Sequence, residues 1–400
     1  MDSNPPSRRE RTRPLPSEPS PRVRPGTVLA GAILVSLLLC AYFLREPVQS
    51  PFSRRPAGVS GCVALWERPG VKATVAWVSD SGSVGLISAP AADGVRLLTV
   101  GPEGKDILEG YAPRGRLLVS RAGEAMAAID GDTGTGLIWS PGGLSPLTAP
   151  VGAAAVDKLY CAGDHYLVLR VTPAGPNQTI GAALSAFDAR GRLLYQYLLE
   201  EGTATAFAAT GARYAAIAFS VPRSGTLESL IWLLDMVEGR LWEVAVGPDA
   251  VTRLELTAEA EYIAIAAGKR VFLLNRLGQR LWSEEVKGII AGLAIAELNS
   301  VVLLTADPAT VTYYDPRGRR LWERALDGSP VGLQAVADGS GLVLATTFAI
   351  HGYDVKGRLR WTAPASIDLK SLAVSPSGSH VLCVYVDGSL RLIKPGVTGD

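Results

Sequence analysis

The chain has 400 residues with 39 basic and 38 acidic side chains, so its formal net charge is +1. This balance excludes a protein whose main role is to coat nucleic acid or an acidic surface. An apolar fraction of 48% with 43 glycines and 27 prolines favours many short buried strands joined by tight turns over long helices.

The first 58 residues predict a membrane anchor. Residues 1–25 are rich in Pro, Ser and Arg, so we expect a disordered cytoplasmic tail. No residue from Pro25 to Leu44 is charged, and at ~1.5 Å per residue this stretch reaches ~30 Å, one hydrocarbon core. We therefore predict a transmembrane helix over residues 26–44. Residues 45–58, with three prolines, predict an extended linker.

Arginines set the orientation of this predicted helix. Six precede it and three follow it closely, so the positive-inside rule predicts a cytoplasmic N-terminus and an extracytoplasmic remainder, in a single-pass protein of the cell membrane. A cleaved signal peptide is the alternative, but no small-x-small cleavage pattern follows Leu44 directly. The arginines are Arg8, Arg9, Arg11, Arg13, Arg22 and Arg24 before the helix, and Arg45, Arg54 and Arg55 after it.

One pattern recurs along the rest of the chain. Asp or Asn follows an apolar segment, Gly comes three or four positions later, and an aromatic residue stands seven positions after the Asp or Asn. The Asp or Asn can accept a backbone N–H and Gly can take a left-handed conformation, so each copy predicts a hairpin turn. The copies are Asp188-Gly191-Tyr195, Asp235-Gly239-Trp242, Asn275-Gly278-Trp282, Asp315-Gly318-Trp322 and Asp354-Gly357-Trp361, with a looser copy at Asp130-Gly134-Trp139.

The spacing of these turns predicts the architecture. Successive Asp or Asn positions lie 47, 40, 40 and 39 residues apart, close to the ~40 to 45 residues of a propeller blade. Apolar runs such as Tyr262–Ala267 are continuous, as expected for sheets covered on both faces. We predict an all-β propeller of four-stranded blades over residues 59–394, followed by a tail at 395–400. The recurring tryptophans should pack between blades.

The run Asp-Pro-Arg-Gly-Arg-Arg-Leu-Trp at 315–322 resembles the quinoprotein-type (PQQ-like) propeller repeat. The resemblance covers roughly residues 59–394, and it is to bacterial membrane-anchored, non-catalytic propellers. It implies that each run forms the third strand, turn and fourth strand of a blade. The outer-membrane assembly propeller is a similar eight-bladed scaffold, but it has a lipid anchor in place of a spanning helix.

Eight blades are expected, with seven as the alternative. Residues 372–393 supply three strands without a fourth, and Cys62–Arg68 contains a copy of the sequence around Trp322, so we predict that this N-terminal segment closes the last blade. Seven blades stay open because the first blade, over residues 71–100, looks one strand short. The outer-strand positions we assign are Leu98, Trp139, Tyr195, Trp242, Trp282, Trp322 and Trp361.

Catalysis is not predicted. The three histidines lie in no metal or nucleophile motif, and the turn carboxylates fall on different blades. The resemblance also raises a quinone-dependent dehydrogenase, which would need adjacent cysteines and a carboxylate-rich calcium site, and neither pattern occurs. We expect no catalytic residue, cofactor or metal, and leave open whether Cys62, Cys161 and Cys383 are all free.

A protein-binding scaffold of the cell envelope is the expected function, and an extracytoplasmic ligand sensor is the alternative. Strand parity puts three long loops on one face: Pro141–Val151, Thr172–Gly181 and Val221–Leu230. The partner would be a protein or cell-wall material, not nucleic acid, and its identity is open. The partner-binding residues we predict are Leu144, Leu147, Asn177, Gln178, Arg223 and Glu228.

Overall fold

In a computed structural model the chain forms two compact units, Met1–Ala57 and Gly58–Asp400. The structure describes residues 61–396, apart from 89–94, 113–116, 123–124, 131–134, 141–142, 149–155, 163–164, 173–180, 189, 200–201, 211–212, 224 and 297–298. The predicted tail, helix and linker lie outside these residues. Within them, no helix has the length and apolar character to cross a membrane.

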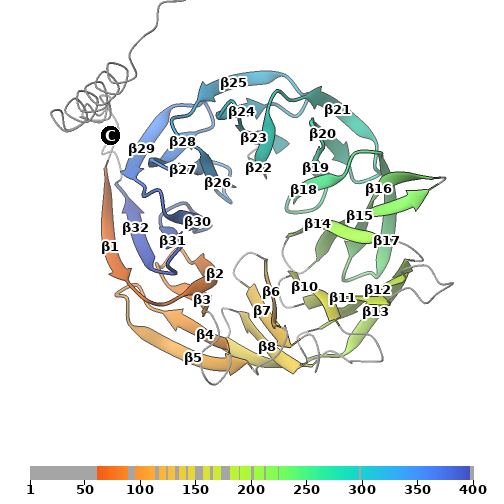
Figure 1. The fold of residues 1–400 in the computed structure, drawn as a ribbon, viewed down its shortest axis with the longest axis horizontal. Helices are drawn as coiled ribbons and strands as arrows, with labels where there is room; N and C mark the ends of the chain where they lie inside the picture. The colour runs from red at the N-terminus through yellow and green to blue at the C-terminus, as the bar shows by residue number, and fades with distance from the viewer. Residues whose placement is uncertain are drawn as a thin grey trace, which may run out of the picture. The chain divides into compact units, whose positions relative to one another are not determined.

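Eight antiparallel sheets of four strands each form a ring, as Figure 1 shows. The fold class predicted from the repeats is therefore confirmed, with eight blades. Blades 1 to 4 contain β2 (Ala73–Val78), β3 (Val84–Ser88), β4 (Val95–Val100), β5 (Asp106–Ala112); β6 (Leu117–Ala122), β7 (Ala125–Asp130), β8 (Thr135–Ser140), β9 (Gly143–Thr148); β10 (Val156–Ala162), β11 (His165–Thr172), β12 (Gly181–Phe187), β13 (Leu193–Leu199); and β14 (Thr203–Thr210), β15 (Tyr214–Arg223), β16 (Thr226–Asp235), β17 (Arg240–Gly247).

The other four blades follow in chain order, and the last one takes its fourth strand from the start of the ring. Blades 5 to 8 contain β18 (Val251–Leu256), β19 (Tyr262–Ala267), β20 (Arg270–Asn275), β21 (Arg280–Glu285); β22 (Ile289–Ile295), β23 (Val301–Ala306), β24 (Thr310–Tyr314), β25 (Arg320–Ala325); β26 (Pro330–Ala335), β27 (Gly341–Thr346), β28 (Ala349–Asp354), β29 (Leu359–Pro364); and β30 (Leu369–Val374), β31 (Val381–Tyr385), β32 (Leu390–Pro395), β1 (Cys62–Arg68).

The ring closes by strand exchange, as predicted. β1 pairs antiparallel with β32, from Cys62 opposite Pro395 to Arg68 opposite Leu390. The backbone N–H of Gly396 also donates to the carbonyl of Gly61 at 2.8 Å. β1 thereby covers the edge of β32 and completes blade 8 with the four strands that the other blades have.

The repeated turns form as the sequence predicts. In blade 6 the Oδ1 atom of Asp315 accepts the backbone N–H groups of Arg317 and Arg319, both at 2.9 Å, and Gly318 has a φ of 79°. The pKa of the Asp315 carboxyl is lowered because these donors and the Arg319 guanidinium outweigh desolvation by burial, the largest single effect. The carboxylate is therefore ionised at neutral pH and holds the turn.

Three of the recurring aromatic residues pack on the glycine turn of the next blade, whereas Val244 and not Trp242 meets Gly278, and Trp361 lies over Gly352 of its own blade. A Cβ added to Gly318 would lie 2.7 Å from the Trp282 ring, and one added to Gly357 would lie 2.7 Å from Trp322. Tyr195 stands in the same relation to Gly239. The turn glycine thus supplies positive φ and also makes room for its neighbour's aromatic ring.

Two outer-strand assignments are wrong. Leu98 lies on β4 and Trp139 on β8, each the third strand of its blade. In blade 2 the loose copy Asp130-Gly134-Trp139 joins the second strand to the third, so the aromatic falls one strand inward. Blade 1 is also complete, because β5 follows a turn that begins at Gly101 instead of Asp and was not recognisable as a repeat.

Candidate functional site

Strand direction divides the ring into two faces. Neighbouring strands are antiparallel, so the loops between second and third strands share one face with the loops that join consecutive blades. We call this the hairpin face. The Asp-x-x-Gly turns and the loops between first and second strands form the opposite face, which we call the turn face. Gly61 and Gly396 meet at the turn-face ends of β1 and β32.

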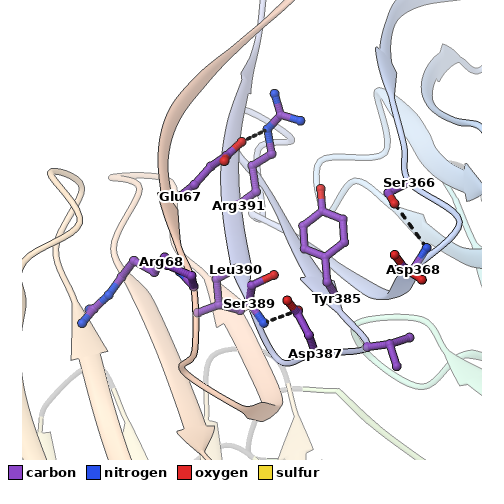
Figure 2. A pocket seen from close by; sticks show the side chains of 11 residues that line it. Glu67, Arg68, Ser366, Asp368, Tyr385, Asp387, Ser389, Leu390 and Arg391 are labelled. Carbon is purple, nitrogen blue, oxygen red and sulfur yellow. Dashed lines mark hydrogen bonds and ion pairs between the residues drawn. The ribbon is translucent and has the colours of Figure 1, made fainter.

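A cavity of about 660 Å³ opens on the hairpin face where the ring closes. We call it the seam cavity. It lies between the end of β1, the loop from β29 to β30 and the turn from β31 to β32. Figure 2 shows the Tyr385 ring standing between that loop and the β31–β32 turn. Its charged or hydroxyl-bearing lining residues include Glu67, Asp368, Tyr385, Asp387, Ser389 and Arg391.

Both arginines at the seam already have anionic partners. Arg391 Nε lies 3.0 Å from Glu67 Oε1, and Arg68 forms an ion pair with Asp106. Figure 2 shows the Arg68 side chain directed away from Tyr385, so its guanidinium group does not lie beside the Tyr385 ring.

Two carboxylates of the seam cavity have no cationic partner among the residues that the structure describes: Asp368 and Asp387. Asp387 Oδ1 accepts the backbone N–H of Ser389 at 2.8 Å. Hydrogen bonding from Ser389, first from its side chain and then from its backbone, lowers the pKa of Asp387, so this carboxyl is ionised at neutral pH. Desolvation by burial raises the pKa of Tyr385, so the phenol keeps its proton and can donate.

Three exposed apolar side chains lie on the hairpin face in and next to the loops of the cavity. Val386 lines the cavity, Ile367 lies between its lining residues Ser366 and Asp368, and Phe348 lies in the β27–β28 loop with its ring near Gly328. Phe348, Ile367 and Val386 are 56%, 74% and 69% exposed, and we call them the apolar rim. Backbone hydrogen bonds join their loops: Val386 N–H donates to Asp368 at 2.8 Å, and Ala365 N–H donates to Phe348 at 3.0 Å. Exposed apolar groups beside a polar cavity are typical of protein-interaction surfaces.

A second feature of the hairpin face is an extended hairpin in blade 4, at the outer side of the ring in Figure 1. β15 and β16 have ten residues each, and beyond Ser220 and Ser229 they pair only with each other. Near its tip, Arg223 forms ion pairs with Glu228 at 3.3 Å and with Glu243 at 3.5 Å. Two of the six predicted partner-binding residues are thus brought together, and both lie on strands.

The predicted loops need correction in two of three cases. Pro141–Val151 contains β9, so Leu144 and Leu147 lie on the outermost strand of blade 2 opposite Trp139 and Gly136. β9 contains Pro146, which an edge strand tolerates. Val221–Leu230 is mostly paired strand with its turn near Gly225. Asn177 and Gln178 lie outside the described residues.

Two of the three histidines, and Cys161 and Cys383, are buried. His351 is buried with Nδ1 3.2 Å from the Thr362 hydroxyl, and His380 is buried with Nδ1 3.0 Å from the Ser379 hydroxyl. No group of three His, Cys, Asp or Glu side chains among the described residues could hold a metal ion. Cys62, Cys161 and Cys383 form no disulfide there.

No protein-family model and no curated protein matches the chain. Solved structures do match. The C-terminal WD40 domain of Sif2 has a TM-score of 0.63 at 12% identity, over 84% of this chain and 99% of that one. The fold is a WD40-like β-propeller. Sqt1 from Saccharomyces cerevisiae has a TM-score of 0.58 at 10% identity, over 86% of this chain and 100% of that one. Chaetomium thermophilum Sqt1, bound to the N-terminus of the ribosomal protein L10, has a TM-score of 0.60 at 13% identity, over 83% and 99%.

Sequence reasoning missed the seam cavity entirely. Its residues come from both ends of the ring, with Glu67 and Arg391 brought together only by the pairing of β1 with β32. The closure itself was predicted, and following it to the adjacent turn at Asp387 would have placed these side chains near one another. No sequence pattern indicated the apolar rim, because a single Phe, Ile or Val in a loop is common.

Proposed function

We propose that the protein is a non-enzymatic, membrane-anchored scaffold in the cell envelope that binds a protein partner on the hairpin face of its extracytoplasmic propeller. The observation that carries the binding part is the apolar rim on the hairpin face, of which Val386 lines the seam cavity. Three side chains that are more than half exposed, beside a cavity of about 660 Å³, form a surface that a partner would desolvate favourably. The membrane part rests on the uncharged stretch from Pro25 to Leu44 and on the arginines before it.

The position of the chain ends supports this use of the two faces. Residues 61 and 396 meet at the turn face, on the side of the ring opposite the apolar rim. Structural neighbours give support from analogy: Sqt1 is solved with the N-terminus of the ribosomal protein L10, and another neighbour is solved in a mitotic checkpoint complex.

Ile367→Cys and Leu277→Cys form a matched pair for testing this proposal in intact cells. Ile367 is 74% exposed on the hairpin face, and Leu277 is 73% exposed on the turn face. A membrane-impermeant, bifunctional thiol reagent should label both variants, because both positions lie outside the cytoplasm. Only Ile367→Cys should yield a covalent adduct with another protein, detected by a mass shift on denaturing gels.

The unsubstituted chain gives the background from the native thiols, of which Cys161 and Cys383 are buried and Cys62 is half-buried. If neither variant is labelled until the cells are lysed, the extracytoplasmic assignment is wrong. If Leu277→Cys gives the same adduct as Ile367→Cys, the hairpin face is not the binding face.

A further inference from the structure

We propose that the seam cavity binds a lysine or arginine side chain of the partner, while apolar residues of the same partner segment pack on the apolar rim. This inference rests on the proposed function, since it names the chemistry that the hairpin face would recognise. It concerns a cavity of about 660 Å³, which is large enough for a long side chain and lies within the usual range of ligand sites.

The charge of the cavity selects the ligand. Glu67 and Arg391 neutralise each other at 3.0 Å, whereas Asp368 and Asp387 face the cavity without a cation among the described residues. The remaining formal charge is therefore about −2, and a partner that buried these carboxylates without a cation would leave them desolvated and unpaired. An ammonium or guanidinium group between them would form charge-assisted hydrogen bonds.

The shape of the cavity suits a side chain with a long aliphatic stem. Figure 2 shows the Tyr385 ring between the loop that carries Asp368 and the turn that carries Asp387. The methylene groups of a lysine or arginine could lie along this ring while the charged end reaches the carboxylates. The ring face also attracts a cation.

The neighbouring apolar rim argues for a side chain that belongs to a protein segment. The backbone N–H of Val386 donates to the carbonyl of Asp368 at 2.8 Å, so an apolar side chain of the rim is held next to the acidic side of the cavity. A free metal ion or small polyamine would use the carboxylates but leave the apolar side chains exposed. A peptide covers both, and the contacts at the apolar rim would be desolvated together with the ion pairs.

The test uses a double variant and a control matched in local geometry. Asp368→Asn with Asp387→Asn removes both charges, and asparagine at 387 can still accept the backbone N–H of Ser389. Asp338 on the turn face accepts the backbone N–H of Ser340 at the same 2.8 Å, so Asp338→Asn is the control. Random peptides displayed on phage are selected on the wild-type protein, and the enriched peptides are synthesised for fluorescence anisotropy.

Enriched peptides should carry lysine or arginine next to an apolar residue. Their Kd should rise about tenfold or more in the double variant, and stay within about twofold in Asp338→Asn. Replacing the peptide's basic residue by glutamine should weaken binding to wild type by a similar factor. The same replacement should leave binding to the double variant almost unchanged, because that variant already lacks the carboxylates that the basic residue contacts.

Other outcomes separate this inference from the proposed function. Peptides that need Phe348, Ile367 and Val386 but are indifferent to the double variant would keep the binding face and overturn the basic-residue assignment. Equal binding of free spermidine and of the peptide to the cavity would assign it to small cations and also overturn the inference. If no peptide binds wild type better than the triple variant Phe348→Ser, Ile367→Ser, Val386→Ser, the proposed function fails too.

Discussion

Deletion of residues 59–68 is expected to abolish the folded monomer. The deletion removes β1, the fourth strand of blade 8, and uncovers Leu390, Leu392 and Ile393 of β32, all of which are buried. It also exposes the backbone edge of β32, which would pair with other chains. The loss of a full strand ladder should exceed the ~5 kcal/mol that marks the lower end of domain stability.

Chemical denaturation and size-exclusion chromatography measure this effect, and a chain lacking only residues 1–44 serves as control because it keeps every described strand. Trp66→Ala tests the same closure of the ring with a single substitution. Trp66 packs over the turn at Gly104 but is only half-buried, so its truncation should cost about 2 kcal/mol, below the ~3–5 kcal/mol of a fully buried ring. A monomeric 59–68 deletion with an unchanged denaturation midpoint would show that β1 does not close the ring.

Gly357→Ala is expected to destabilise the protein far more than Gly70→Ala. Both glycines have a φ of 73°, so alanine pays the same left-handed backbone cost of about 1–2 kcal/mol at either position. A Cβ at Gly70 has no atom within 4 Å, whereas one at Gly357 would lie 2.7 Å from the Trp322 ring. The clash should add a further ~1–3 kcal/mol at Gly357.

The difference between the two variants in the free energy of unfolding isolates the packing between blades 6 and 7. The double variant with Gly357→Ala and Trp322→Leu should be destabilised by less than the sum of the two single variants, since the smaller side chain relieves the clash. Equal destabilisation by Gly357→Ala and Gly70→Ala would mean that the turn glycine is required for its conformation alone, and that Trp322 does not depend on it.

The second half of the ring was predictable because each blade repeats the same local chemistry. Asp315 and Asp354 begin their turns with identical hydrogen-bond patterns, and each following tryptophan lies on the fourth strand. Local turn chemistry and tertiary packing agree there, so the sequence period equals the structural period. The prediction that Cys62–Arg68 closes the ring followed from the same repeat.

The first half was harder because its turns use different residues. Blade 1 turns at Gly101 without an Asp, and blade 2 carries its Asp130 one strand earlier than the other blades. The segment predicted as a long loop after Pro141 contains the outermost strand of blade 2, β9, instead. Functional residues were the least predictable, since the seam cavity depends on contacts between residues more than 300 positions apart.

Hydrogen–deuterium exchange on the protein with its captured partner tests the central claim most directly. The hairpin-face segments 346–348, 366–368 and 385–389 should exchange more slowly in the complex than in the free protein, because the partner covers them. The turn-face segments 316–319 and 355–358 should keep the same exchange rates in both states. Protection of the turn-face segments with no change at 366–368 and 385–389 would contradict the account.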